Sequence, residues 1–160
     1  MQFLYTLCFI KRGKSILMLN RNKSPWFGIW NGVGGKRNQG ESPLDCIHRE
    51  ILEETNIKVD KHSIFDKGIV TWNGEFNTPS LGLHLYFAEV PEDFDYITPI
   101  ETREGILAWK QIDWIVNKEN LGVSYNIPYF IMNVIQDKKK YHYHCEFKGN
   151  ELLSVEVKDL

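Results

Sequence analysis

The chain has 160 residues, with 19 Lys and Arg against 21 Asp and Glu, which gives a formal net charge of −2. With 42% hydrophobic and 25% charged residues, the composition excludes collagen-like, coiled-coil and wholly disordered proteins. The near-neutral charge argues against a broad basic surface for nucleic acid. The length suits one domain, so we expect residues 1–160 to form a single domain.

The cysteines and the apolar segments indicate where the protein resides. Cys8, Cys46 and Cys145 are odd in number and widely spaced, which disfavours a disulfide scaffold or a Cys-based zinc site and favours a reducing compartment. No basic segment precedes the apolar residues 3–10, and no stretch approaches the roughly 18 to 20 apolar residues of a membrane span. We therefore expect a soluble, cytoplasmic protein with neither membrane nor nucleic-acid partners, acting as a monomer or a homodimer.

The N-terminal quarter of the chain predicts a hairpin followed by a loop. Residues 3–10 and 15–19 are rich in aromatic and branched side chains, and the turn candidate at 11–14 separates them. Residues 20–40 carry six Gly or Pro residues and predict a long loop, a feature that is often functional in compact domains.

A helix is expected next. Ser42 is a good N-cap and Pro43 suits the first helical position, whereas Asn56 can adopt the left-handed conformation that ends a helix after Thr55. Further along, the pattern predicts strands at 67–72, 81–90 and 105–110, a helix at about 127–139 with Lys138 to Lys140 at its C-terminal end, and a closing hairpin of 141–147 and 151–157. Such a mixture favours a mixed sheet sandwiched by helices.

Three glutamates of the first helix, Glu50, Glu53 and Glu54, share one face at the spacing i, i+3, i+4. Like charges at that spacing repel by a few tenths of a kcal/mol per pair, so stability alone does not favour them. A solvated acidic face is the ordinary interpretation of such a cluster. A hard divalent cation would reverse the sign, because Mg²⁺ prefers carboxylates together with substrate phosphates.

The residues around these glutamates point to a supported metal site. Arg49 lies four residues before Glu53, which allows an ion pair that would orient a ligand carboxylate. Glu41 can pair either with Arg49 or with the helix dipole. Gly34 and Gly35 permit close backbone approach, and a free carbonyl there can complete a metal site.

Taken together, residues 35–57 (GKRNQGESPLDCIHREILEETNI) resemble the Nudix box, the signature of the Nudix hydrolases. With each fixed residue at about 6–7% frequency, a chance match anywhere in the chain has a probability of about 10⁻⁵. One departure is Asn56, where the family usually has Gly, and Asn is the next-best residue for a left-handed backbone.

The resemblance implies an α/β fold, the Nudix-type α/β/α sandwich with a mixed sheet. It also implies hydrolysis, dependent on Mg²⁺ or Mn²⁺, of a nucleoside diphosphate linked to another group. By the family's pattern, the metal ligands are Glu50, Glu53, Glu54 and the Gly34 carbonyl, and Arg49 supports them. The residue that deprotonates water varies within the family, and both Glu53 and Glu104 are candidates.

Flanking stretches are similar to the mammalian-type 8-oxo-dGTP diphosphatases, enzymes of nucleotide-pool sanitation. The matching stretches are Tyr5 to Leu7, Trp30 to Lys36 (WNGVGGK), Glu104 five residues before Trp109, and the segments 138–142 and 147–149. By that resemblance Thr6 and Asn31 line the base pocket and Phe27 or Trp26 stacks on the base. Lys36, beside the glycines, is a candidate phosphate contact.

A second departure bears on the substrate. The mammalian enzymes read the oxidised base with a Trp and two Asp before the second helix, whereas this chain has Asn126 in a stretch without acids. Asn126 offers both a donor and an acceptor to a purine, which keeps a purine pocket and weakens the case for 8-oxoguanine. The alternatives are a Nudix hydrolase for ADP-ribose, nucleotide sugars or dinucleoside polyphosphates, and a non-catalytic nucleotide sensor.

Overall fold

The computed structural model describes residues 3–23, 27–73 and 81–160. Within these ranges one sheet has the strand order β10-β9-β5-β6-β1-β2-β8-β7, and β3 and β4 branch from it by pairing with β2 and β1. The strands are β1 (Tyr5–Arg12), β2 (Ser15–Arg21), β3 (Trp30–Asn31), β4 (Val33–Lys36), β5 (Ile64–Trp72), β6 (Gly82–Val90), β7 (Ile100–Glu101), β8 (Gly105–Gln111), β9 (Tyr141–Lys148) and β10 (Glu151–Asp159).

The sheet is mixed, as expected. β1 pairs with β6 in parallel over its whole length, and β5 pairs with β9 in parallel, whereas β1 with β2 and β9 with β10 form the two expected antiparallel hairpins. Gly13 supplies the positive φ of 58° that the first hairpin turn requires.

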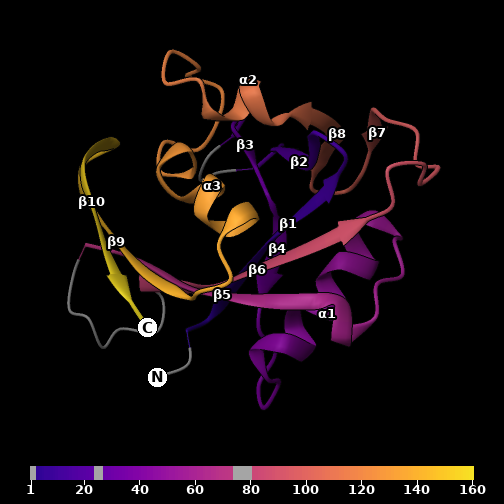
Figure 1. Cartoon of the computed structure of the whole chain (residues 1–160), viewed down its shortest axis with the longest axis horizontal. Helices are drawn as coiled ribbons and strands as arrows, with labels where there is room; N and C mark the ends of the chain where they lie inside the picture. Colours follow the sequence, from indigo (N-terminus) through magenta and orange to yellow (C-terminus); the bar gives the residue numbers. More distant parts are fainter. Residues whose placement is uncertain (1–2, 24–26, 74–80) are drawn as a thin grey trace.

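Helices cover both faces of the sheet, which gives the expected sandwich (Figure 1). They are α1 (Pro43–Thr55), α2 (Ile112–Val116) and α3 (Ile127–Gln136), with a short 3₁₀ turn at Lys61–Ser63. One apolar core lies between the sheet and α1 and includes Ile47 and Ile51. The other lies on the opposite face under α2 and α3 and includes Ile115 and Phe130.

Two predicted elements need correction. The predicted loop at 20–40 contains β3 and β4. The two short strands carry no alternation of apolar residues among the glycines, and they form by pairing with β2 and β1. The predicted helix to about residue 139 ends at Gln136, since Asp137 is extended at φ −94° and ψ 141°. Lys139 and Lys140 lie beyond the helix and form ion pairs with Asp159 and Asp66.

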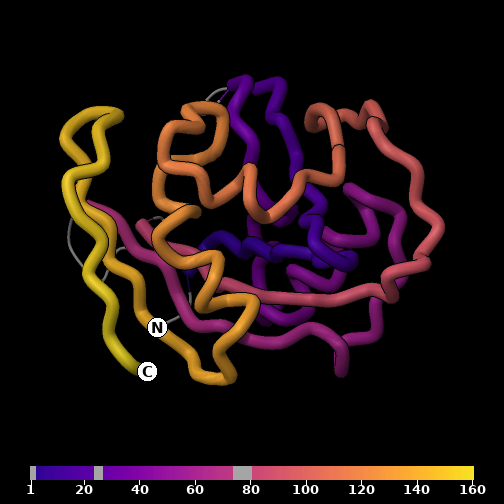
Figure 2. Tube along the Cα trace, turned by 45° about the horizontal axis from the view of Figure 1, so that its top comes forward, coloured from indigo at the N-terminus to yellow at the C-terminus, as the bar shows by residue number. Residues whose placement is uncertain are grey.

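The segment before α3 lies beside β3 (Figure 2). The Trp30 N–H donates to the Gly122 carbonyl at 2.7 Å, and the Ser124 N–H donates to the Trp30 carbonyl at 3.0 Å. The contact brings together two parts of the chain that are about 90 residues apart. Among the described helices, none is long and apolar enough to cross a membrane.

Candidate active site

Helix α1 begins and ends where its sequence predicts. The Ser42 hydroxyl accepts a hydrogen bond from the Asp45 N–H at 3.1 Å, and Pro43 occupies the first turn. Asn56 is left-handed with φ 61°, and its N–H donates to the Leu52 carbonyl at 2.9 Å. Both ends of the helix are therefore fixed, and its acidic face has a defined position over β4.

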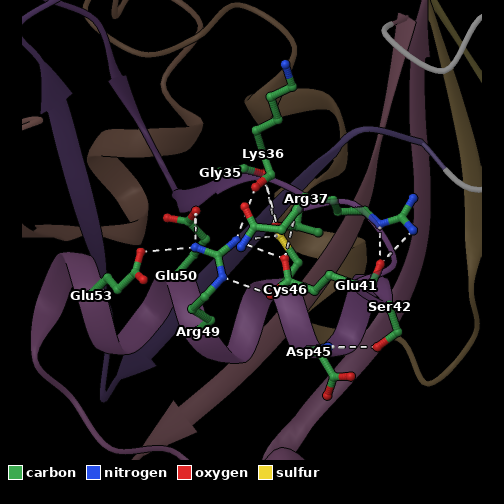
Figure 3. A network of polar contacts seen from close by, with 12 residues as sticks. Gly35, Lys36, Arg37, Glu41, Ser42, Asp45, Cys46, Arg49, Glu50 and Glu53 are labelled. Atoms are coloured by element: carbon green, nitrogen blue, oxygen red, sulfur yellow. Dashed lines mark hydrogen bonds and ion pairs between the residues drawn. The ribbon is translucent and has the colours of Figure 1, made fainter.

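Arg49 is the centre of the polar network on that face (Figure 3). Its guanidinium donates to both carboxylate oxygens of Glu41, at 2.8 and 2.9 Å, and this bidentate contact lowers the pKa of Glu41 to about 2. It also donates to Glu50 at 2.9 Å, to Glu53 at 3.0 Å and to the Lys36 carbonyl at 3.2 Å. One cation thus partly neutralises three carboxylates.

Glu50 lies directly against β4. A Cβ added at Gly35 would lie only 2.4 Å from the Glu50 carboxylate, so glycine is required for this approach. The Glu50 side chain is 14% exposed, and its burial raises the pKa of the carboxyl although Arg49 counteracts the shift. The negative charge of Glu50 is therefore held in a largely buried position against the backbone of β4, where it is unfavourable without a nearby cation.

Glu54 is the most strongly perturbed carboxylate of the group. Burial, followed by the negative charge of Glu50, raises its pKa to about 8, and the charge of Glu104 adds to this shift. The Gly34 N–H donates to Glu54 at 3.2 Å, which stabilises the charged form only in part. Glu104 therefore lies within electrostatic range of Glu54, although it comes from the turn before β8 and not from α1.

These residues fit a divalent cation. Buried carboxylates are stable as anions only beside positive charge, and hard oxygen donors are those that Mg²⁺ and Mn²⁺ bind. Within the described ranges no three His, Cys, Asp or Glu side chains converge as a ready-made metal cluster. The carboxylates do not converge on one point because Glu50 and Glu53 both point toward the Arg49 guanidinium. Gly34 contacts Glu54 through its N–H, and its carbonyl stays a predicted ligand.

Gly35 offers a test of this geometry. We expect Gly35→Ala to lower kcat/KM by about ten- to a hundredfold, because the new methyl displaces the Glu50 carboxylate by about an ångström. The melting temperature should change little, since the displaced group is the end of a flexible side chain. Steady-state kinetics beside thermal unfolding would check both, and wild-type kinetics would contradict the assigned position of Glu50.

The residues that we expect to contact the nucleotide differ in their surroundings. Thr6 is buried, with its hydroxyl donating to the Gly35 carbonyl at 3.3 Å and lying 3.3 Å from the Cys46 sulfur, so it contacts β4 and α1. Phe27 is 72% exposed, which leaves its ring free to stack, and Trp26 lies outside the described residues. The Lys36 side chain is exposed beside the network that its backbone joins.

Asn31 lies on β3, and Asn126 lies at the start of α3, two residues after the segment that pairs with β3. The Asn31 side-chain oxygen accepts the Gly32 N–H at 2.8 Å. The Ser124 hydroxyl donates to the Asn126 oxygen at 3.1 Å, and the Asn126 amide donates to the Cys145 sulfur at 3.8 Å. Sequence reasoning missed the contact of Asn126 with Cys145, because only the fold brings β9 next to the start of α3.

Comparison with known proteins agrees with this architecture. A family model described as NUDIX domain matches residues 1–123. The mouse (Mus musculus) protein named oxidized purine nucleoside triphosphate hydrolase is 28% identical over 159 residues, which cover 98% of this chain and 95% of that one. The zebrafish (Danio rerio) protein of the same name is 27% identical over 98% of this chain and 97% of that one.

Solved structures share the fold. The crystal structure of a MutT protein from Bacillus halodurans superposes with a TM-score of 0.72 at 24% identity and covers 96% of both chains. The NUDIX domain of Shewanella oneidensis NrtR, solved with ADP ribose, gives 0.61 at 15% identity and covers 85% of this chain and 86% of that one. Because the family model spans more than half of the sequence, the chain belongs to the NUDIX domain family, the Nudix hydrolases.

Proposed function

We propose that the chain is a Mg²⁺-dependent pyrophosphohydrolase of nucleoside triphosphates. Its substrates are oxidised purine deoxynucleotides such as 8-oxo-dGTP, which it cleaves to the monophosphate and pyrophosphate. The observation that carries this proposal is the pair of buried carboxylates, Glu50 and Glu54, held against the glycine backbone of β4. The names of the mouse and zebrafish relatives, which match nearly the whole chain, support the substrate class.

The metal site follows from the carboxylates. Nudix hydrolases generally use divalent metal cations. Here Glu50, Glu53, Glu54 and the Gly34 carbonyl would hold Mg²⁺, with Mn²⁺ as a possible substitute. When bound, the ion neutralises charge on the diphosphate and lowers the pKa of water. Arg49 holds Glu50 and Glu53 in place through hydrogen bonds of 2.9 and 3.0 Å, so its role is to position them.

A general base is also needed, because the attacking water must lose a proton as its oxygen bonds to phosphorus and the bridging P–O bond breaks. Glu53 is 58% exposed and stands at the open side of the network. Glu104 is the alternative, and its carboxylate lies 3.7 Å from the Lys23 ammonium. Both carboxylates therefore have a cationic neighbour, since Glu53 pairs with Arg49 at 3.0 Å. We assign the role to Glu53, because it lies on α1 beside the proposed metal ligands Glu50 and Glu54.

The base of the nucleotide is assigned to the region where β3 meets the segment before α3. Asn31 and Asn126 can each present a donor and an acceptor to a purine edge, and Phe27 can stack on the base with a contribution of about 1–3 kcal/mol. Lys36 is assigned to a phosphate. The place of Thr6 in the base pocket stays a prediction, because its hydroxyl is occupied under α1.

A substrate panel with Mg²⁺ tests the proposal. It should contain 8-oxo-dGTP, dGTP, an oxidised dATP, ADP-ribose, a nucleotide sugar and a dinucleoside polyphosphate, with products identified by chromatography. We expect the oxidised purine triphosphates to give the highest kcat/KM, and chelation of the metal to abolish turnover reversibly. Preference for ADP-ribose over every deoxynucleotide would overturn the substrate assignment, and nucleotide binding without turnover of any compound would favour the sensor.

A further inference from the structure

The two edges of the sheet differ greatly in length. At one edge lies β7, which has two residues, and at the other lies β10, which has nine. Figures 1 and 2 both show β10 at the rim of the molecule, and within the described residues its outer edge pairs with no strand. A long edge strand presents unpaired N–H and C=O groups that can receive another strand.

Apolar side chains extend to this edge. Val155 and Val157 face the same side of the sheet as buried Cys145 and Tyr143, their partners on β9, and Val155 packs against the core under α3. Val157 is nevertheless 44% exposed, and Leu153, at the bulge, is 57% exposed. The apolar layer of the sheet therefore continues to the rim, where part of it meets water.

The opposite side of β10 carries charge in a self-complementary pattern. Glu156 and Lys158 are next but one to each other, and across the strands they pair with His144 and His142. The Lys158 ammonium lies 3.3 Å from the Glu156 carboxylate of the same strand, and both side chains stay more than half exposed, so each can also meet a charge of a second copy. Suppose that a second copy of β10 is added antiparallel, with Val157 on the two-fold axis. Glu156 then lies opposite Lys158 of the second copy, and the symmetry repeats this pair of opposite charges.

Neighbouring registers are less favourable. Centring the pairing on Glu156 sets that carboxylate opposite its own copy, and centring it on Lys158 does the same for two ammonium groups. A register centred on Val155 runs into the β-bulge between Leu152 and Ser154, which breaks the alternation of the two faces. The register centred on Val157 also sets Asp159 opposite Val155 of the second copy, so it is the pairing of Glu156 with Lys158, together with the bulge, that favours it over its neighbours.

We propose that β10 is a homodimerisation edge, at which two copies of the chain pair antiparallel about Val157 and continue the sheet across a two-fold axis. The contact is small, so the dimer is a weak, concentration-dependent one. It is independent of the proposed hydrolase function, because none of its residues belongs to the network around Arg49.

Sedimentation velocity of the whole chain from about 10 µM to 1 mM tests the proposal, with charge variants as its probes. We expect a monomer–dimer equilibrium in the wild-type protein. Lys158→Glu places Glu opposite Glu twice, and Glu156→Lys places Lys opposite Lys twice, so either change should raise the dissociation constant by at least about tenfold. The double variant Glu156→Lys/Lys158→Glu restores opposite charges and should return the dissociation constant to within about threefold of wild type.

Lys138→Glu is the matched control for Lys158→Glu, because it makes the same change in net charge at an exposed site outside β10 and should leave the equilibrium unchanged. Circular dichroism confirms that each variant is folded. A wild-type chain that stays monomeric over the whole range overturns the proposal. A dimer that is equally stable in all four variants also overturns it, since a different surface would then join the copies.

Discussion

Replacing Glu53 by Gln is expected to lower kcat at least about a hundredfold, the lower end for loss of a positioned general base. The amide keeps the size of the side chain and can still accept a hydrogen bond from Arg49, which now lies 3.0 Å from the carboxylate. It cannot take a proton from water or supply a charge to a metal. Because Glu53 is 58% exposed, the melting temperature should hardly change. Single-turnover kinetics on the preferred substrate measure the effect.

Two further variants make this result specific. Glu104→Gln should reduce kcat less than Glu53→Gln if Glu53 is the base, and the reverse order would assign the role to Glu104. Glu119→Gln, at an exposed position outside the network, should behave as wild type. Turnover by Glu53→Gln within tenfold of wild type, with the fold intact, would refute the assignment.

Replacing Glu54 by Gln is expected to weaken Mn²⁺ binding at least about a hundredfold, since even residues that only support a ligand contribute ten- to a hundredfold. Without metal the pKa of Glu54 is raised to about 8, so at pH 7 its carboxyl is mainly protonated and a neutral amide costs little stability. A cation needs the carboxylate, and binding at pH 7 must therefore release this proton.

The affinity for Mn²⁺ is therefore expected to depend on pH. The affinity of the wild-type protein for Mn²⁺ should rise as pH increases toward about 8, because fewer protons then compete with Mn²⁺ for the Glu54 carboxylate. Glu54→Gln should lose most of this slope. Calorimetry in two buffers of different ionisation enthalpy measures the released proton, and equal slopes in the two proteins would show that Glu54 does not bind the metal.

The sequence predicted the elements whose signals are local. Ser42, Pro43 and Asn56 define the ends of α1 through their own backbone geometry, and all three have the predicted roles. The strands β3 and β4 were missed because they are short, carry no apolar alternation among the glycines, and form only by pairing with β2 and β1. The overrun of the second long helix has a similar cause, since the lysines after Asp137 bind acidic residues far away in the chain.

In the candidate site, too, the sequence predicted the contacts that depend on local spacing. A spacing of four residues is enough to pair Arg49 with Glu53, and the structure has that contact together with the pair to Glu41, one of two partners considered. The sequence could not show that Glu50 lies against Gly35 or that the Gly34 N–H contacts Glu54. Those contacts depend on how α1 packs across β4, which no local pattern encodes.

We propose that divalent ions lie between the α1 carboxylates and the diphosphate of a nucleotide. Electron paramagnetic resonance of Mn²⁺, titrated with the wild-type protein and a non-hydrolysable purine nucleotide, tests it most directly. We expect Mn²⁺ to bind tightly only with nucleotide present, and Glu50→Gln and Glu54→Gln each to weaken this binding. Free Mn²⁺ signals unchanged by the protein, with or without nucleotide, would contradict the account.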